Sequence, residues 1–161
     1  MMVNYYRPHV WLIPEDDADR QLANGFMNHD AVDDNRISVR APAGGWSKVL
    51  DVFENEYVPR LRNYRDHHVV MLIDFDDVEG RMTQFEQRIP DDVRSRVFVI
   101  GPKDEPEDLK RELGMTFEKI GRELAQNCLE GGYDLWQHPH IRHNNAELQR
   151  LVAAVRPILF S

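Results

Sequence analysis

The sequence HVVMLIDFDD, from His68 to Asp77, contains the features that decide the fold. Its apolar part, Val69–Ile73, is rich in β-branched residues and is typical of a strand that is buried on both faces of a sheet. Carboxylates follow at once, as Asp74, Asp76 and Asp77. Because ligands of α/β sheets bind at the carboxyl ends of the strands, we expect a binding site here. If the extended backbone continues, Asp74 and Asp76 project to the same side, and a divalent cation between them would relieve their repulsion.

A second apolar run ends in the same way. The run His9–Ile13 is followed by Pro14, Glu15, Asp16 and Asp17. Taken alone, this acidic group is also typical of a helix start, because Asp caps helices and carboxylates favour the positive end of the helix dipole. Two such groups after two apolar strands instead favour one shared acidic site.

Strands alternate with helices along the whole chain. We expect strands at about residues 9–13, 36–40, 68–73 and 96–100, and helices at about 17–28, 47–64, 78–89, 107–113, 117–129 and 145–155. We also expect a kink at Pro59, and Asn144 or Asn145 as the cap of the last helix. This order predicts a three-layer α/β fold with a mostly parallel sheet and helices on both faces. We expect residues 1–161 to form a single α/β domain, with a C-terminal helical extension from about residue 115.

Composition excludes several classes of protein. The 161 residues carry a formal net charge of −8, which argues against a broad basic surface for gripping nucleic acid but not against a metal-dependent nuclease. The one cysteine, Cys128, excludes an intramolecular disulfide and a cysteine-based zinc site. There is no apolar run long enough to cross a bilayer and no signal-peptide core, so we expect a cytoplasmic protein without a membrane partner.

The two acidic groups resemble the TOPRIM domain, which is found in bacterial primases, topoisomerases and several small nucleases. That family has a glutamate after its first strand and an Asp-x-Asp motif after a later strand, in a compact parallel α/β domain. Glu15 matches the first position, and Asp74-Phe75-Asp76 matches the second. The resemblance covers about residues 9–101. It departs from the family where a glycine commonly follows the glutamate, so Asp16 or Asp17 is an alternative for the working carboxylate.

The resemblance implies Mg²⁺- or Mn²⁺-dependent hydrolysis of nucleic-acid phosphodiesters. Asp74 and Asp76, with Asp77, would hold one or two ions, and Glu15 would act as general base or complete a second metal site.

The same resemblance suggests further contacts and partners. Arg20 and Lys103 are candidate phosphate contacts, although the position of Lys103 favours a solvated loop lysine. Nucleic acid and an ATPase subunit are the partners that the resemblance implies.

Two other functions remain open. A receiver-like phosphoacceptor domain would use Glu15, Asp16, Asp74 and Lys103, although the helix at 47–64 and the second aspartate of the Asp-x-Asp motif fit it less well. The net charge of −8 also suits a non-catalytic acidic subunit that binds a basic partner.

Two further features lie outside the acidic groups. A loop with His138, His140 and His143 is either a polar loop that caps the last helix or a source of one histidine near a substrate phosphate. Trp46, which follows Gly44 and Gly45, is a candidate surface anchor for a partner.

Overall fold

The computed structural model of this protein describes residues 6–76, 78, 80–130, 135, 138, 139, 141 and 144–160. In these residues a four-stranded sheet has the order β2-β1-β3-β4, and every neighbouring pair is parallel. The strands are β1 (His9–Pro14), β2 (Ile37–Val39), β3 (His67–Leu72) and β4 (Val97–Ile100). The predicted α/β class, the four strands and their parallel pairing are therefore confirmed.

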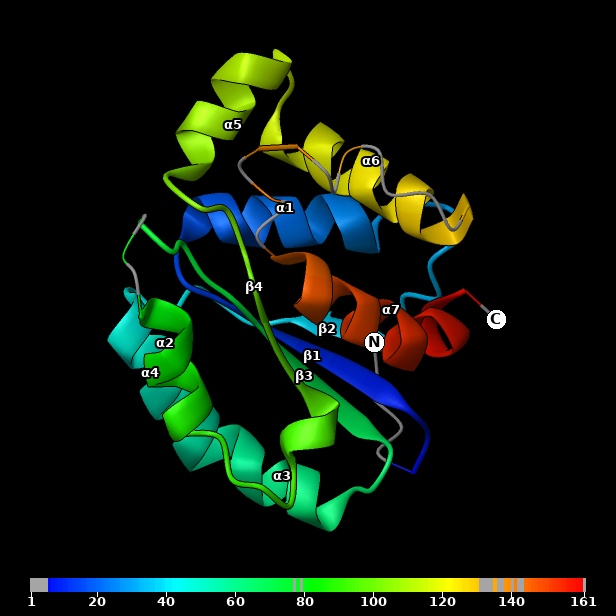
Figure 1. Ribbon diagram of the computed structural model, residues 1–161. Coiled ribbons are helices and arrows are strands. Elements are labelled where there is room, and N and C mark those ends of the chain that lie inside the picture. The colour runs from blue at the N-terminus through cyan, green and yellow to red at the C-terminus, as the bar shows by residue number, and fades with distance from the viewer. Residues whose placement is uncertain are drawn as a thin grey trace.

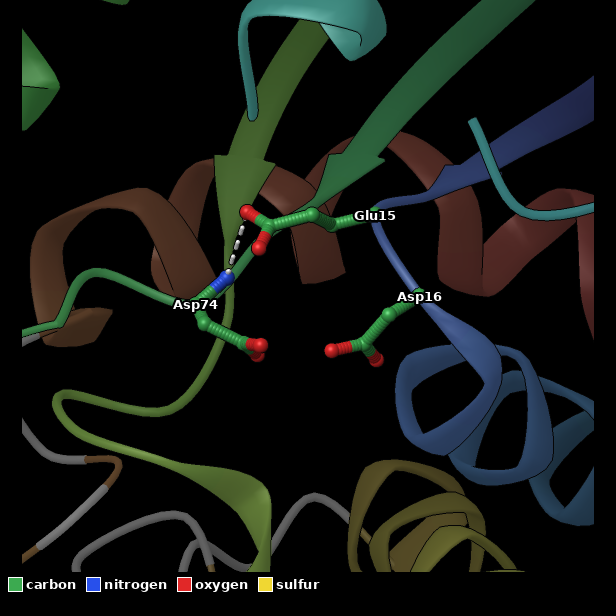
Figure 2. Close-up of side chains that lie close together, drawn as sticks. All are labelled: Glu15, Asp16 and Asp74. Atoms are coloured by element: carbon green, nitrogen blue, oxygen red, sulfur yellow. Dashed lines mark hydrogen bonds between the residues drawn. The ribbon is translucent and has the colours of Figure 1, made fainter. Parts of the chain in front are cut away.

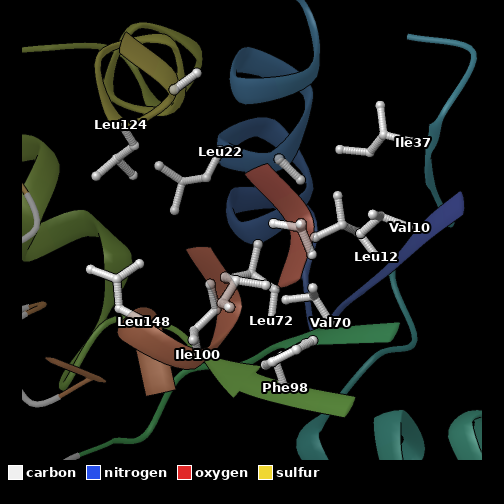
Figure 3. Packing of buried hydrophobic residues seen from close by; sticks show 14 of the residues in the cluster. Val10, Leu12, Leu22, Ile37, Val70, Leu72, Phe98, Ile100, Leu124 and Leu148 are labelled. Carbon is white, nitrogen blue, oxygen red and sulfur yellow. The ribbon is translucent and has the colours of Figure 1, made fainter. Parts of the chain in front are cut away.

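Helices cover both faces of the sheet, as the alternation of buried side chains requires (Figure 1). Val10 and Leu12 of β1 pack into one core, whereas Trp11 and Ile13 pack into the other. The first core, shown in Figure 3, lies under α1 (Asp17–Met27), α5 (Pro106–Leu113), α6 (Phe117–Glu130) and α7 (Asn145–Leu159). The second lies under α2 (Trp46–Val52), the π-helical segment η1 (Phe53–Tyr57), α3 (Val58–Asn63) and α4 (Arg81–Gln87). A short 3₁₀ turn, η2 (Arg94–Arg96), leads into β4.

The helix expected over residues 47–64 is interrupted, as its proline predicts. The π-helical segment η1 separates α2 from α3 directly before Val58 and Pro59. Proline has no N–H to donate to the carbonyl one turn earlier, so a change of helical register here avoids an unmade bond.

Side chains of helix α7 form hydrogen bonds with backbone groups of β4, the edge strand of the sheet. The Glu147 carboxylate accepts a hydrogen bond from the Val99 N–H at 2.9 Å, and Arg150 Nη2 donates to the Val97 carbonyl at 2.7 Å. These bonds replace the ladder that a fifth strand would supply beside β4. The helix begins at Asn145 and runs to Leu159, past the predicted end at residue 155.

Asn144 is the N-cap residue of α7, as expected, but its side chain forms no capping hydrogen bond. Its amide bonds the backbone of Gly101 instead, since Nδ2 donates to the Gly101 carbonyl at 2.8 Å and Oδ1 accepts from the Gly101 N–H at 3.3 Å. Gly101 has no room for a side chain, because a Cβ atom there would lie 1.6 Å from the Ile73 carbonyl oxygen. This close approach holds the end of β4 against the residue that precedes Asp74.

No helix within the described ranges has the length and apolarity that crossing a membrane would require.

Candidate metal site

The two acidic groups meet at one edge of the sheet. Glu15 directly follows β1 and Asp74 follows β3, and these two strands are parallel neighbours. Within the sheet, β2 lies next to β1 on one side and β3 lies next to β1 on the other. The chain passes from β1 to β2 first, and β3 is then placed on the opposite side of β1. The space beyond β1 and β3 is therefore the point where the strand order reverses, which is where open α/β sheets bind ligands.

Three carboxyl groups converge at this point (Figure 2). One oxygen from each of Glu15, Asp16 and Asp74 lies within 4.8 Å of the other two. Glu15 Oε1 accepts a hydrogen bond from the Asp74 N–H at 3.3 Å, which ties the two strand ends together. Glu15 and Asp74 are only 9% and 5% exposed, so these carboxyl groups are largely removed from water.

Asp19 brings a fourth carboxyl group to the same place. It lies in the first turn of α1, is fully buried, and donates its backbone N–H to Asp16 Oδ1 at 3.1 Å. Neither Asp19 carboxyl oxygen has a hydrogen-bond partner among the described residues, and the same is true of Asp74 Oδ1. A carboxyl proton can link Asp19 to Asp74 or Asp16, but the ionised oxygens have no donor. Because buried carboxylates normally find donors, these oxygens are available to a cation once the groups ionise.

The sequence prediction overlooked Asp19. Asp16 caps α1, and residues three apart in a helix share a face, so the spacing from Asp16 to Asp19 was the available signal.

Burial and repulsion between neighbouring carboxyl groups raise the pKa values of Glu15, Asp19 and Asp74. Burial, with smaller effects from Asp76 and Asp16, raises the pKa of Glu15 to about 7. Burial likewise raises the pKa of Asp74 to about 8, and that of Asp19 is raised well above its usual value, chiefly by burial and then by the charge of Asp74. Glu15, Asp19 and Asp74 therefore cannot all ionise at neutral pH unless a cation joins them.

A divalent cation fits this donor set. Carboxylate oxygens are the ligands that hard cations such as Mg²⁺ and Ca²⁺ prefer, and Mn²⁺ accepts the same set. Glu15, Asp16 and Asp74 could hold a metal ion, and the unpartnered oxygens of Asp19 lie beside Asp16 and Asp74.

Asp76 is not one of the converging carboxyl groups, although its charge acts on Glu15. Strand β3 ends at Leu72, and its hydrogen bonding to the β4 side continues through the Phe75 N–H. Asp76 then has a left-handed backbone with a φ angle of 52°. The condition under which Asp74 and Asp76 project to the same side is therefore not met. The Asp76 side chain is 46% exposed, and its Oδ2 atom lies 3.8 Å from Nη1 of Arg81. Asp77 lies outside the described residues.

Asp17, Arg20 and Lys103 lie at the surface. Asp17 is bound by Arg20 at 2.6 Å, and the side chains of both are exposed, so this pair faces outward from α1. Lys103 is exposed in the segment after β4. His138 Nε2 lies 3.3 Å from the Glu112 carboxylate of α5, whereas His140 and His143 lie outside the described residues.

Comparisons with protein-family models, curated protein sequences and solved structures gave no match.

Proposed function

We propose that this protein is a small TOPRIM-like domain that hydrolyses nucleic-acid phosphodiesters with the help of Mg²⁺ or Mn²⁺. One observation carries the proposal: buried carboxyl groups with unpartnered oxygens converge where the strand order reverses. Such an arrangement destabilises a fold and is retained where a bound cation compensates for it.

The residues divide into two roles. Asp74, Asp16 and Asp19 are the candidate ligands of a first ion, because they lie close together and Asp74 and Asp19 are buried. Glu15 either completes that ligand set or accepts the proton of the attacking water, since its pKa of about 7 suits a general base at neutral pH. A bound divalent ion supplies charge stabilisation to the phosphodiester and acidifies its water.

The proposal is tested by nicking of supercoiled plasmid DNA, and by cleavage of a single-stranded RNA, with Mg²⁺ or Mn²⁺ present. We expect activity from the wild type and a loss of at least about a hundredfold in Asp74→Asn and Glu15→Gln. Asp17→Asn is the matched comparison, because Asp17 is a neighbouring carboxylate that faces solvent. Equal activity in wild type and Asp74→Asn would contradict the proposal, and loss only in Asp17→Asn would support the alternative carboxylate.

The other two functions predict different results. A receiver-like domain requires Asp74 to attack a small phosphodonor, so acetyl phosphate would label the wild type but not Asp74→Asn. The 5% exposure of Asp74 does not favour that attack. A non-catalytic acidic subunit would be inert in both assays and would form a stable complex with a basic partner. An ATPase subunit as partner stays a prediction from the resemblance.

A further inference from the structure

Arg81 is a buried arginine whose hydrogen-bonding capacity is largely unused. It is the first residue of α4, and only 9% of its side chain is exposed. Its Nε and Nη1 atoms are buried and form no hydrogen bond with any described residue. A buried guanidinium group is normally paired with several acceptors, so this arrangement is unfavourable unless a ligand provides them.

The guanidinium group is held in place by an aromatic platform. Its central carbon lies 4.4 Å from the ring centroid of Trp46. The Trp46 ring in turn packs against Phe85 of α4, with 6.2 Å between the ring centroids. Stacking of this kind fixes the plane of the guanidinium group while leaving its N–H edge available for an anion.

Asp76 shows the side from which an anion can approach. Its Oδ2 atom lies 3.8 Å from Arg81 Nη1, which is too long for a hydrogen bond. The Asp76 side chain is 46% exposed, so this side of Arg81 leads to solvent.

The platform borders the acidic cluster formed by Glu15, Asp16, Asp19 and Asp74. The N–H groups of Gly44 and Gly45 both point at the Glu15 carbonyl oxygen, at 2.9 and 3.4 Å, and Trp46 comes next in the chain. The charge of Arg81 also lowers the pKa of Glu15, against the larger effect of burial. A fixed positive group therefore lies beside a set of candidate metal ligands.

We propose that Arg81, held on Trp46, binds a non-bridging oxygen of the substrate phosphate while the acidic cluster holds the metal ion. This inference rests on the proposed function and adds the residue that recognises the phosphate. An oxygen arriving from the side of Asp76 would exchange the 3.8 Å contact for charge-assisted hydrogen bonds to the N–H groups of Arg81. The competing explanation is that Arg81 serves only as the counter-charge of Asp76.

The test separates metal binding from phosphate binding. Calorimetry first measures the affinity for Mn²⁺ alone, and then the affinity for the dinucleotide thymidylyl-thymidine with Ca²⁺ present. In Arg81→Met we expect a phosphodiester affinity lower by about tenfold to a hundredfold. Mn²⁺ affinity should stay equal or rise, because removal of a positive charge does not weaken the binding of a cation. Arg81→Lys should lose less, since it keeps the charge but not the planar fork.

Arg62→Met is the matched control. Arg62 is exposed and pairs with Asp92 at 2.9 Å, away from the acidic cluster, so both affinities should match the wild type. Unchanged phosphodiester affinity in Arg81→Met would overturn the inference.

Two further outcomes remain decisive. If circular dichroism shows that Arg81→Met is unfolded, Arg81→Lys decides, and wild-type affinity in that variant overturns the inference. If the wild type binds no Mn²⁺, the proposed function fails. In that case, the metal-free wild type and Arg81→Met are titrated with inorganic phosphate. Weaker phosphate binding by Arg81→Met would support Arg81 as the phosphate contact, and equal binding would overturn the inference.

Discussion

Ionisation of the Asp74 carboxyl group destabilises the metal-free fold. Asp74 is 5% exposed, Oδ1 has no hydrogen-bond partner among the described residues, and burial raises its pKa to about 8. In the unfolded chain the same group ionises near its ordinary value of 3.8. The folded protein therefore holds the proton more tightly, and its stability falls as the pH rises from about 4 to about 8.

Asp74→Asn should accordingly stabilise the metal-free protein at pH 8. We expect a gain of about 1–3 kcal/mol in the free energy of unfolding, because the amide cannot ionise and the remaining carboxyl groups repel less. At pH 4.5 the gain should nearly vanish. Urea denaturation at the two pH values measures the difference.

Asp17→Asn is the control variant for this stability measurement. Asp17 is exposed, and its hydrogen bond from Arg20 lowers its pKa, so Asp17→Asn should leave the free energy of unfolding nearly unchanged at both pH values. A stability gain in Asp74→Asn that is the same at pH 4.5 and pH 8 would argue against an ionisation effect.

At this scale the sequence predicted the meeting of Glu15 and Asp74, because residues after neighbouring parallel strands share one edge of a sheet. Asp76 could not be placed in this way, since its position depends on a left-handed turn after the strand. The juxtaposition of Arg81 with Trp46 depends on how α4 packs, which local sequence spacing does not determine.

At the scale of elements, the packing of α1 on α6 fixes two of the acidic residues. The helices approach so closely that a Cβ atom on Gly121 would lie 2.0 Å from the Leu22 carbonyl oxygen. A Cβ atom on Gly25 would likewise lie 2.0 Å from the carbonyl oxygen of Glu118. Because α1 carries Asp16 at its cap and Asp19 in its first turn, α6 indirectly positions both carboxyl groups.

Gly121→Ala should separate the two helices and displace the start of α1. We expect a loss of about 1–3 kcal/mol in the free energy of unfolding, because the new methyl group meets rigid backbone. Mn²⁺ affinity should also fall, while Lys119→Ala, an exposed change on α6, should leave both unchanged. Thermal denaturation and Mn²⁺ titration provide the two measurements, and unaltered stability in Gly121→Ala would show that the close packing is not required.

Element positions were largely predictable from the sequence, and their side-chain partners were not. The period of apolar residues and the glycine and proline signals located the strands and most helices. The helix expected over residues 78–89 is shorter, at Arg81–Gln87, because the chain first completes the turn after β3. The role of Asn144 depended on Gly101, which is 43 positions away in sequence.

At the scale of the whole molecule, the two ends of the sheet differ in their ionisable groups. The carboxyl ends of β1 and β3 carry the acidic cluster, whereas their amino ends carry His9 and His67, which are almost fully buried. His67 Nδ1 accepts a hydrogen bond from Trp11 Nε1 at 3.0 Å, and His9 Nε2 lies 2.8 Å from Ser38 Oγ. Burial, with a smaller effect from His67, lowers the pKa of His9 to about 4.

This histidine end makes the fold sensitive to acid. In the unfolded chain His9 takes up a proton near pH 6.5, whereas in the folded protein it does so only near pH 4. Its contribution to stability is therefore complete above pH 6.5 and is lost as the pH falls towards 4. The wild type should lose about 2–3 kcal/mol more than His9→Gln between pH 7 and pH 4.5, as measured by urea denaturation. Ser38→Ala keeps the titrating ring, so its loss should match that of the wild type, and parallel profiles for wild type and His9→Gln would remove His9 as the cause.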